Sequence, residues 1–253
     1  MLLFFYNFFL YLTSPIIILI ILIRVILGKE HNKKYIEKLG ITNNIYKKKN
    51  KLIWFHACSV GEVKSLERIS QIFLNKKYDV LVTTSTLLSE AYVKKNFSKG
   101  VFHQFLPLDL NFFVKKFLMN YKPNISVFVE SEIWPNLINN CRKNNIPLVL
   151  IQASFSDKSL KRWQLFKKFF KSLLEKFDFI IAQSQIEKNK LFKFANIKIH
   201  DVYNLKNSSL KLKVKISNVI KIKREVKNSF IILALSTHAG EEKILLNSLK
   251  EIT

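Results

Sequence analysis

Ser59 and Glu62 are the first pair of residues whose types and spacing could do chemistry. They follow the apolar run 52–56 (LIWFH), which predicts a short buried strand, and they begin the helical spacing of 61–74. A glutamate at this position could deprotonate a hydroxyl nucleophile as a general base. The same S-x-x-E spacing is that of a capping box, in which the two side chains satisfy free backbone N–H groups at a helix start. The two interpretations are compatible, and the spacing alone leaves both open.

Glu130 and Glu132 follow a second apolar run (ISVFV), and Asn136 lies four residues further on. If the strand continued through the two glutamates, both carboxylates would lie on one face, because side chains alternate along a strand. The alternative is a solvated loop in which Trp134 packs and Pro135 starts the next helix.

Ser236, Thr237, His238 and Glu241 follow a third apolar run (FIILAL). Hydroxyl groups and a glycine at a helix N-terminus can hold a phosphate through backbone N–H groups. A plain N-cap with acids in the first helical turn explains the same residues. The segment lacks the glycine pattern of a P-loop or dinucleotide-binding turn. The chain also has no Asp-x-Asp pair and no histidine spacing typical of metal ligands, so we expect no metal site and no cofactor.

Composition and charge exclude several classes of protein. The 42 Lys and Arg residues outnumber the 18 Asp and Glu residues, which gives a formal net charge of +24, yet only five of the basic residues are Arg. Such a charge attracts nucleic acid or an anionic membrane. We favour the membrane and expect no nucleic-acid partner, because nucleic-acid readers rely on Arg for bidentate contacts. An apolar content of 49% excludes a disordered chain, and two cysteines cannot build a disulfide framework.

Residues 1–23 contain no charged side chain and are strongly apolar. This length is enough to cross a bilayer, which takes roughly 20 helical residues. Neither a basic n-region nor a small-residue cleavage site marks a signal peptide. We predict a membrane anchor over 1–27 with the rest of the chain on the cytoplasmic face of the inner membrane, because Arg24 and several lysines follow at once. Pro15 would also allow a helix that only dips into the membrane.

Short apolar runs alternate with amphipathic stretches from residue 51 onward. Such alternation indicates a parallel sheet covered on both faces, and we predict a doubly wound α/β domain over residues 28–204. Strands are predicted at 52–56, 79–84, 102–106, 125–129, 147–152 and 179–182, and helices at 61–74, 89–97, 111–120, 135–144, 158–177 and 186–194.

The alternation pauses after residue 204. Residues 205–228 are interpreted as a linker, and a basic edge strand is the alternative for the stretch 211–222, where Lys alternates with apolar residues. Residues 229–253 predict one strand (230–235) followed by one helix (240–249). Two elements cannot bury a core alone, so they either dock on the first domain or begin a second domain that is incomplete in this sequence.

Seven features in a fixed order resemble one protein family. An uncharged N-terminal segment is followed by FHACSVGEV, LVTTST, FLPLDL, VESEIWPNL, YNLK and LSTHAGEE. This order resembles the bacterial 3-deoxy-D-manno-octulosonic acid (Kdo) transferases over the whole chain. The resemblance implies the GT-B arrangement of two facing Rossmann-like domains, of which the first binds the acceptor and the second, incomplete here, binds the nucleotide.

The same resemblance implies transfer of Kdo from CMP-Kdo to a hydroxyl of a lipid A precursor during lipopolysaccharide synthesis, without a metal. It makes Glu62 the general base. It assigns acceptor binding to Ser59, Gly61, Glu130, Glu132 and Asn136. It assigns donor binding to Lys206, Ser236, Thr237, His238 and Glu241.

Two positions depart from the family pattern. Ser154 stands where the family has Arg in N-A-R-L-S, and Tyr203 stands where it has Gly in G-N-L-K. Two rival functions stay open. Another GT-B glycosyltransferase acting on a membrane lipid would differ in its nucleotide sugar. A membrane-bound acceptor-binding module would bind the acceptor with no turnover of its own.

Overall fold

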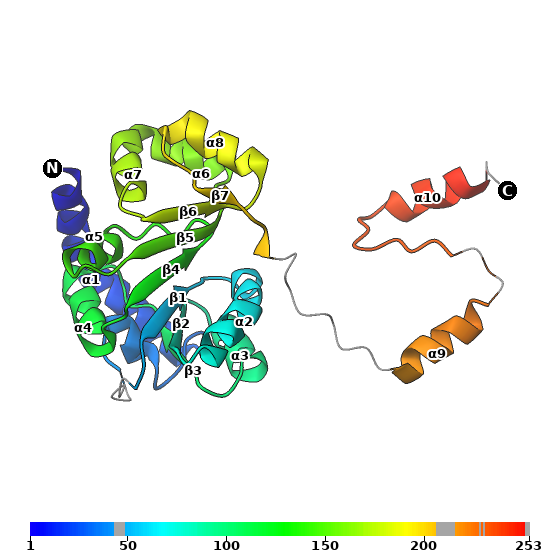
Figure 1. Ribbon diagram of the computed structural model, residues 1–253, viewed down its shortest axis with the longest axis horizontal. Helices are drawn as coiled ribbons and strands as arrows, with labels where there is room; N and C mark the ends of the chain where they lie inside the picture. Colours follow the sequence, from blue (N-terminus) through cyan, green and yellow to red (C-terminus); the bar gives the residue numbers. More distant parts are fainter. Residues whose placement is uncertain (43–48, 206–215, 228, 230, 251–253) are drawn as a thin grey trace. The chain divides into compact units, whose positions relative to one another are not determined.

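The computed structural model describes residues 1–42, 49–205, 216–227, 229 and 231–250. The chain divides into two compact units, residues 1–210 and residues 211–253, and each is described by itself. The first unit contains the predicted α/β domain together with the N-terminal helix (Figure 1).

A seven-stranded parallel sheet forms the centre of the first unit (Figure 1). Its strands follow the order β3-β2-β1-β4-β5-β6-β7. The strands are β1 (Leu52–His56), β2 (Asp79–Thr84), β3 (Val101–Phe105), β4 (Ile125–Val129), β5 (Leu148–Ala153), β6 (Phe179–Ala182) and β7 (Asp201–Val202). The strand order reverses between β1 and β4, and in open sheets of this kind ligands bind beyond the carboxyl ends of the strands at that point.

Helices cover both faces of the sheet because the strands are apolar on both sides. Trp54 packs in the core on one face with Phe117, whereas the adjacent Ile53 and Phe55 pack on the other face with Leu66. The helices are α1 (Leu2–Ile26), η1 (Tyr35–Leu39), α2 (Val60–Asn75), α3 (Leu87–Asn96), α4 (Asn111–Tyr121), α5 (Pro135–Lys143), α6 (Asp157–Trp163), η2 (Gln164–Phe166), α7 (Lys167–Leu174) and α8 (Gln185–Ala195). The predicted doubly wound fold is confirmed.

The long helix predicted over 158–177 is broken by a tight turn. A 3-10 turn, η2, separates α6 from α7. In a straight helix Trp163 and Phe170 would be about 10 Å apart along the axis, but their ring centroids lie 4.9 Å apart. The bend therefore allows the two rings to pack against one another. The periodicity of the sequence does not reveal this contact.

The second unit differs from its prediction. The described residues 231–235 do not form the expected strand, and residues 216–225, interpreted as linker or edge strand, form helix α9 (Ile216–Glu225). A strand needs a neighbour to pair with, and the described residues of this unit supply none. Ile216, Val219 and Ile220 have the spacing of a helix face, which the alternating lysines conceal. Helix α10 (Glu241–Lys250) agrees with the helix predicted at 240–249.

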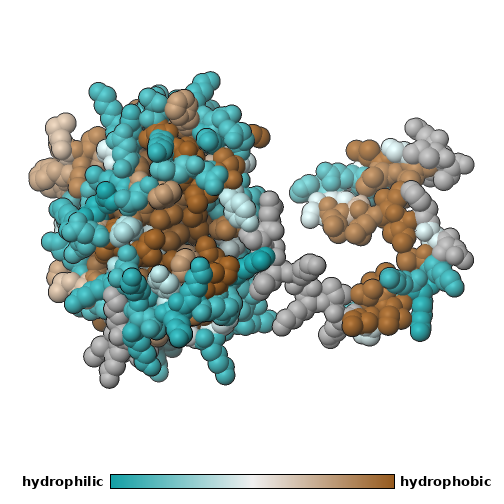
Figure 2. Space-filling view, viewed as in Figure 1, coloured by the Kyte–Doolittle hydropathy of each residue, from teal (hydrophilic) through white to brown (hydrophobic). Residues whose placement is uncertain are grey.

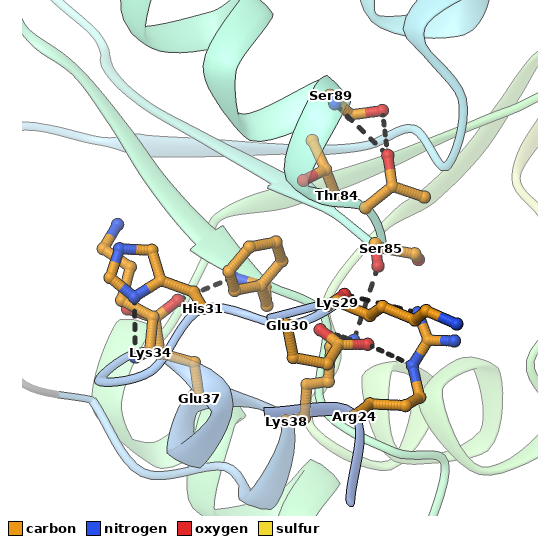
Figure 3. Close-up of polar contacts among 12 residues, drawn as sticks. Arg24, Lys29, Glu30, His31, Lys34, Glu37, Lys38, Thr84, Ser85 and Ser89 are labelled. Carbon is orange, nitrogen blue, oxygen red and sulfur yellow. Dashed lines mark hydrogen bonds and ion pairs between the residues drawn. The ribbon is translucent and has the colours of Figure 1, made fainter. Parts of the chain in front are cut away.

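Buried carboxylates fasten the segment after α1 to the sheet domain (Figure 3). Glu30 accepts hydrogen bonds from Arg24 Nε at 3.0 Å and from Lys38 Nζ at 2.8 Å. Glu37 accepts the backbone N–H of Phe105, the last residue of β3, at 2.8 Å. These contacts tie the C-terminal end of α1 to the edge of the sheet.

Gly40 ends η1 at a point where the chain passes close to α4. Its φ is +69°, and a Cβ there would lie 2.5 Å from the carbonyl oxygen of Phe113. Gly28 has a similar φ of +66°, but a Cβ there would meet nothing within 4 Å. Substitution of the two glycines therefore distinguishes two contributions to stability. Both positions need a left-handed backbone, but only at Gly40 would a side chain overlap its neighbour.

We expect Gly40→Ala to lower the free energy of unfolding more than Gly28→Ala does. The left-handed conformation costs an alanine about 1–2 kcal/mol at either position. Only at Gly40 does the methyl group overlap backbone, which adds roughly 1–3 kcal/mol. Urea unfolding of both variants in the same detergent measures the difference, and equal losses would contradict the close approach to α4.

Candidate active site

The predicted base and acceptor-binding acids gather where the adjacent strands β1 and β4 end. The chain that leaves β1 carries Ser59 and Glu62, and the chain that leaves β4 carries Glu132. Burial raises the pKa of the Cys58 thiol, and the negative charges of Glu132 and Glu62 raise it further. The charges of both carboxylates therefore reach the same thiol, which lies where the strand order reverses.

Glu62 forms the predicted capping box at the start of α2. Its backbone N–H donates to Ser59 Oγ at 3.2 Å, and its carboxylate accepts the N–H groups of Cys58 at 2.8 Å and Ser59 at 3.3 Å. A Cβ on the exposed Gly61 would meet only Ser59 Oγ, at 3.8 Å. Each carboxylate oxygen of Glu62 keeps a second lone pair that could accept a proton. The cap is confirmed, and the role of general base stays a prediction.

Glu132 holds a histidine and a tryptophan together. Its Oε2 lies 3.0 Å from Nε2 of the fully buried His56 and accepts Trp134 Nε1 at 2.7 Å. His56 Nδ1 lies 3.0 Å from Thr83 Oγ1. Burial alone would raise the pKa of Glu132, but the hydrogen bond and charge of His56 and the bond from Trp134 hold it below its usual value. The contact between His56 and Glu132 was not predicted from the sequence, where the place of His56 at the end of a central strand was the available signal.

Two left-handed residues mark the ends of β4 and β5. Glu130 has a φ of +60° and Gln152 a φ of +56°. The Gln152 side chain is buried, and its oxygen accepts the backbone N–H of Leu205 at 3.1 Å. This bond fastens the segment after β7 to the carboxyl edge of the sheet. Lys206, the predicted donor-binding residue that follows, lies outside the described residues.

Asn136 joins α5 to α1. Its side-chain nitrogen donates to Asn7 Oδ1 at 2.7 Å, while its backbone N–H and that of Leu137 donate to the Asp109 carboxylate at 2.9 and 2.8 Å. The Tyr6 hydroxyl donates to the same carboxylate at 2.9 Å. Burial raises the pKa of Asp109 to about 7, although these donors oppose the rise. Asn136 therefore has a structural role, and its predicted contact with the acceptor stays a prediction.

An apolar cavity of about 650 Å³ lies beside the segment that follows the carboxyl end of β4. One side is formed by the N-terminal half of α1, and the other by residues around Trp134 and α6–α7. Its lining consists of Leu2, Phe5, Tyr6, Phe9, Leu10, Thr13, Ile133, Trp134, Pro135, Trp163, Phe166 and Phe169. Because Trp134 also donates to Glu132, the cavity adjoins the His56–Glu132 pair.

The remaining predicted donor-binding residues, Ser236, Thr237, His238 and Glu241, belong to the second unit. Thr237 Oγ1 donates to Glu242 at 2.6 Å, and the His238 N–H donates to Glu241 at 2.9 Å, around the start of α10. Contacts of this kind cap a helix, and phosphate binding by Ser236 and its neighbours stays a prediction. Across the parts of the chain that the structure describes, no three His, Cys, Asp or Glu side chains gather as metal ligands would.

Comparison with known proteins gives sequence relatives along nearly the whole chain. It is 35% identical over 98% of its length to the 3-deoxy-D-manno-octulosonic acid transferase of Rickettsia bellii, of which it covers 59%. It is 31% identical over 97% of its length to the protein of the same name from Haemophilus influenzae, of which it covers 58%. The chain thus spans less than two thirds of the length of these relatives.

A solved structure supports the fold independently. The glycosyltransferase from Rickettsia africae matches with a TM-score of 0.54 and 10% sequence identity, over 81% of this chain and 58% of that one. At this identity the likeness concerns the fold alone.

The family match covers the segment that builds the candidate site. Residues 33–209 match the family described as 3-deoxy-D-manno-octulosonic-acid transferase, and this range includes all seven strands and the capping box of α2. The resemblance found in the short motifs is confirmed, and the chain belongs to the Kdo transferase family of glycosyltransferases.

Proposed function

We propose that this chain carries the acceptor-binding part of an enzyme that transfers Kdo from CMP-Kdo to a hydroxyl of a lipid A precursor. The observation that carries the proposal is that Glu62 and the His56–Glu132 pair lie where the adjacent strands β1 and β4 end, near Cys58 and beside an apolar cavity. A lipid acceptor needs both a base for its hydroxyl and an apolar surface for its acyl chains. The relatives named above are Kdo transferases, which supports the choice of sugar.

The proposed reaction is a single displacement at the anomeric carbon of Kdo. The acceptor oxygen attacks that carbon, the bond from the carbon to the phosphate oxygen breaks, and CMP leaves as a phosphate monoester. Glu62 takes the proton of the acceptor hydroxyl. Lys206 and the backbone N–H groups around Ser236 and Thr237 would meet the charge on the departing CMP, so that no metal is required.

Glu132 is a positioning residue in this scheme. Its Oε2 lies 3.0 Å from His56 Nε2 and already accepts the Trp134 N–H, so this oxygen is less available to a substrate proton than the Glu62 carboxylate is. By fixing Trp134, it shapes the end of the cavity that faces the acids. We propose that one acyl chain of the acceptor occupies the cavity, where each buried CH₂ contributes about 0.8 kcal/mol.

We place the reaction at the cytoplasmic face of the inner membrane. Of the described helices, α1 is the one long and apolar enough to enter a bilayer. The formal net charge of +24 favours an anionic leaflet. The basic residues that follow α1 favour the cytoplasmic side, because that leaflet carries the anionic lipids.

Glu62→Gln in the full-length protein should lower kcat by roughly 10²–10⁴-fold, the usual effect of losing a general base. The amide keeps one oxygen for the cap but cannot replace the second acceptor, so the free energy of unfolding should also fall by about 1–2 kcal/mol. Turnover of CMP-Kdo with a lipid A precursor, normalised to folded protein, measures the first effect.

Glu67→Gln is the matched control, because Glu67 lies on the same helix five residues further on and its carboxylate accepts the Tyr92 hydroxyl at 3.1 Å. We expect its kcat to stay within about threefold of the parent. A Glu62→Gln enzyme with kcat in the same range would remove Glu62 from the mechanism and direct attention to Glu130 and Glu132.

Leu10→Trp should raise KM for the acylated acceptor by about tenfold or more, because the indole fills the cavity from the α1 side. KM for CMP-Kdo should not change. Leu12→Trp, on the exposed face of the same helix, is the control for a larger apolar residue in α1. An unchanged acceptor KM in Leu10→Trp would show that the acyl chains bind elsewhere.

A further inference from the structure

One face of α1 is shielded from solvent along the whole helix. The residues at the centre of this face are buried or half-buried and recur every three or four positions: Leu3, Asn7, Leu10, Ser14, Ile17, Ile21 and Val25. An α-helix has 3.6 residues per turn, so this spacing defines a single face from the first turn to the last. A helix that leaves its domain to cross a membrane would keep such shielding only near the point of exit.

Polar contacts fasten α1 near both ends. The Tyr6 hydroxyl donates to Asp109 at 2.9 Å. Near the other end, Arg24 Nε donates at 3.0 Å to Glu30, which also accepts Lys38 Nζ of η1 at 2.8 Å (Figure 3). The 18 positions between Tyr6 and Arg24 correspond to about 27 Å along the helix axis. This is close to the roughly 30 Å thickness of the hydrocarbon core of a bilayer.

A docked α1 therefore cannot cross a bilayer without taking the flank of the domain with it. The buried Asp109 carboxylate and the Asn136 amide lie against the N-terminal part of the helix. Lys168 and Lys176 of the α7 region line the same depression as Met1 and its neighbours. Charged side chains at that depth in hydrocarbon are strongly unfavourable.

The opposite face of α1 is apolar and open to solvent. Its exposed fractions range from 46% to 84% at Phe4, Phe8, Leu12, Ile16, Leu19, Ile23 and Ile26. Apolar colours gather over the N-terminal end of the helix at the left edge of Figure 2. A continuous strip of this length exceeds what soluble proteins leave in water and is typical of a surface that enters lipid.

We propose that α1 lies in the plane of the membrane, with its outer face in the acyl layer of one leaflet and its inner face on the domain. The N-terminus then stays on the same side of the membrane as the rest of the first unit. This inference concerns attachment alone and does not depend on the reaction proposed above.

Labelling with a membrane-impermeant maleimide tests the sidedness. One cysteine is placed in a short glycine-rich extension before Met1, and the control cysteine replaces the exposed Lys99 (Lys99→Cys). The background carries Cys58→Ser, while Cys141 is fully buried and is kept. In sealed inside-out vesicles from an expressing bacterium, both cysteines should react equally without detergent. An extension that reacts only after detergent, while Lys99→Cys reacts before it, would overturn the proposal.

Nitroxide depth measurements provide a second readout. Leu12→Cys, Leu19→Cys and Ile26→Cys carry the probe along the outer face, in vesicles of phosphatidylethanolamine with some phosphatidylglycerol. An in-plane helix gives the same shallow depth, about 5–10 Å below the headgroups, at all three positions. A depth that is greatest at Leu12 and falls toward Ile26 is the result for a spanning helix and would contradict the proposal, as would a protein that does not bind the vesicles.

Discussion

The parallel pairing of β1 with β4 is the constraint on which the candidate site depends. The two strands are in register from Ile53 to His56. Their pairing brings together the segments that follow their carboxyl ends, which are about 70 residues apart in the chain. Parallel strands have all their carboxyl ends on one side, so the capping box after β1 and the acids after β4 must face the same space. The site can work only if this register is kept, because a shift would separate Glu132 from His56.

Asp109 has a comparable role for the helices around the carboxyl ends of these strands. Its buried carboxylate accepts two backbone N–H groups at the start of α5 and the hydroxyl of Tyr6. A carboxylate with these partners fixes the start of α5 and the N-terminal half of α1 in one arrangement. The apolar cavity lies between these same elements, so its shape depends on a polar contact outside it.

Much of the fold could be predicted from the sequence, because each buried strand is a short apolar run. The runs 52–56, 79–84, 125–129 and 179–182 form strands with the predicted bounds. The missed features depend on side-chain contacts that the apolar pattern does not reveal. The η2 bend brings Trp163 against Phe170, seven positions along the chain, and the docking of α1 joins Asn7 to Asn136.

The candidate site shows the same division. The capping box is local and was predicted from four residues, whereas the His56–Glu132 contact joins residues 76 positions apart and could not be read from spacing. The strand expected at 230–235 is not formed by the described residues 231–235, for a related reason. An apolar run indicates burial, but only pairing with a neighbouring strand makes it a strand.

Hydrogen–deuterium exchange can locate acceptor binding at the ends of β1 and β4. The protein is compared in detergent micelles with and without a lipid A precursor. We expect slower exchange in residues 57–62 and 130–136, and no change in 76–79 and 122–124, which lie at the amino ends of the strands. Protection confined to those amino ends, or no protection at a saturating concentration of the precursor, would contradict this expectation.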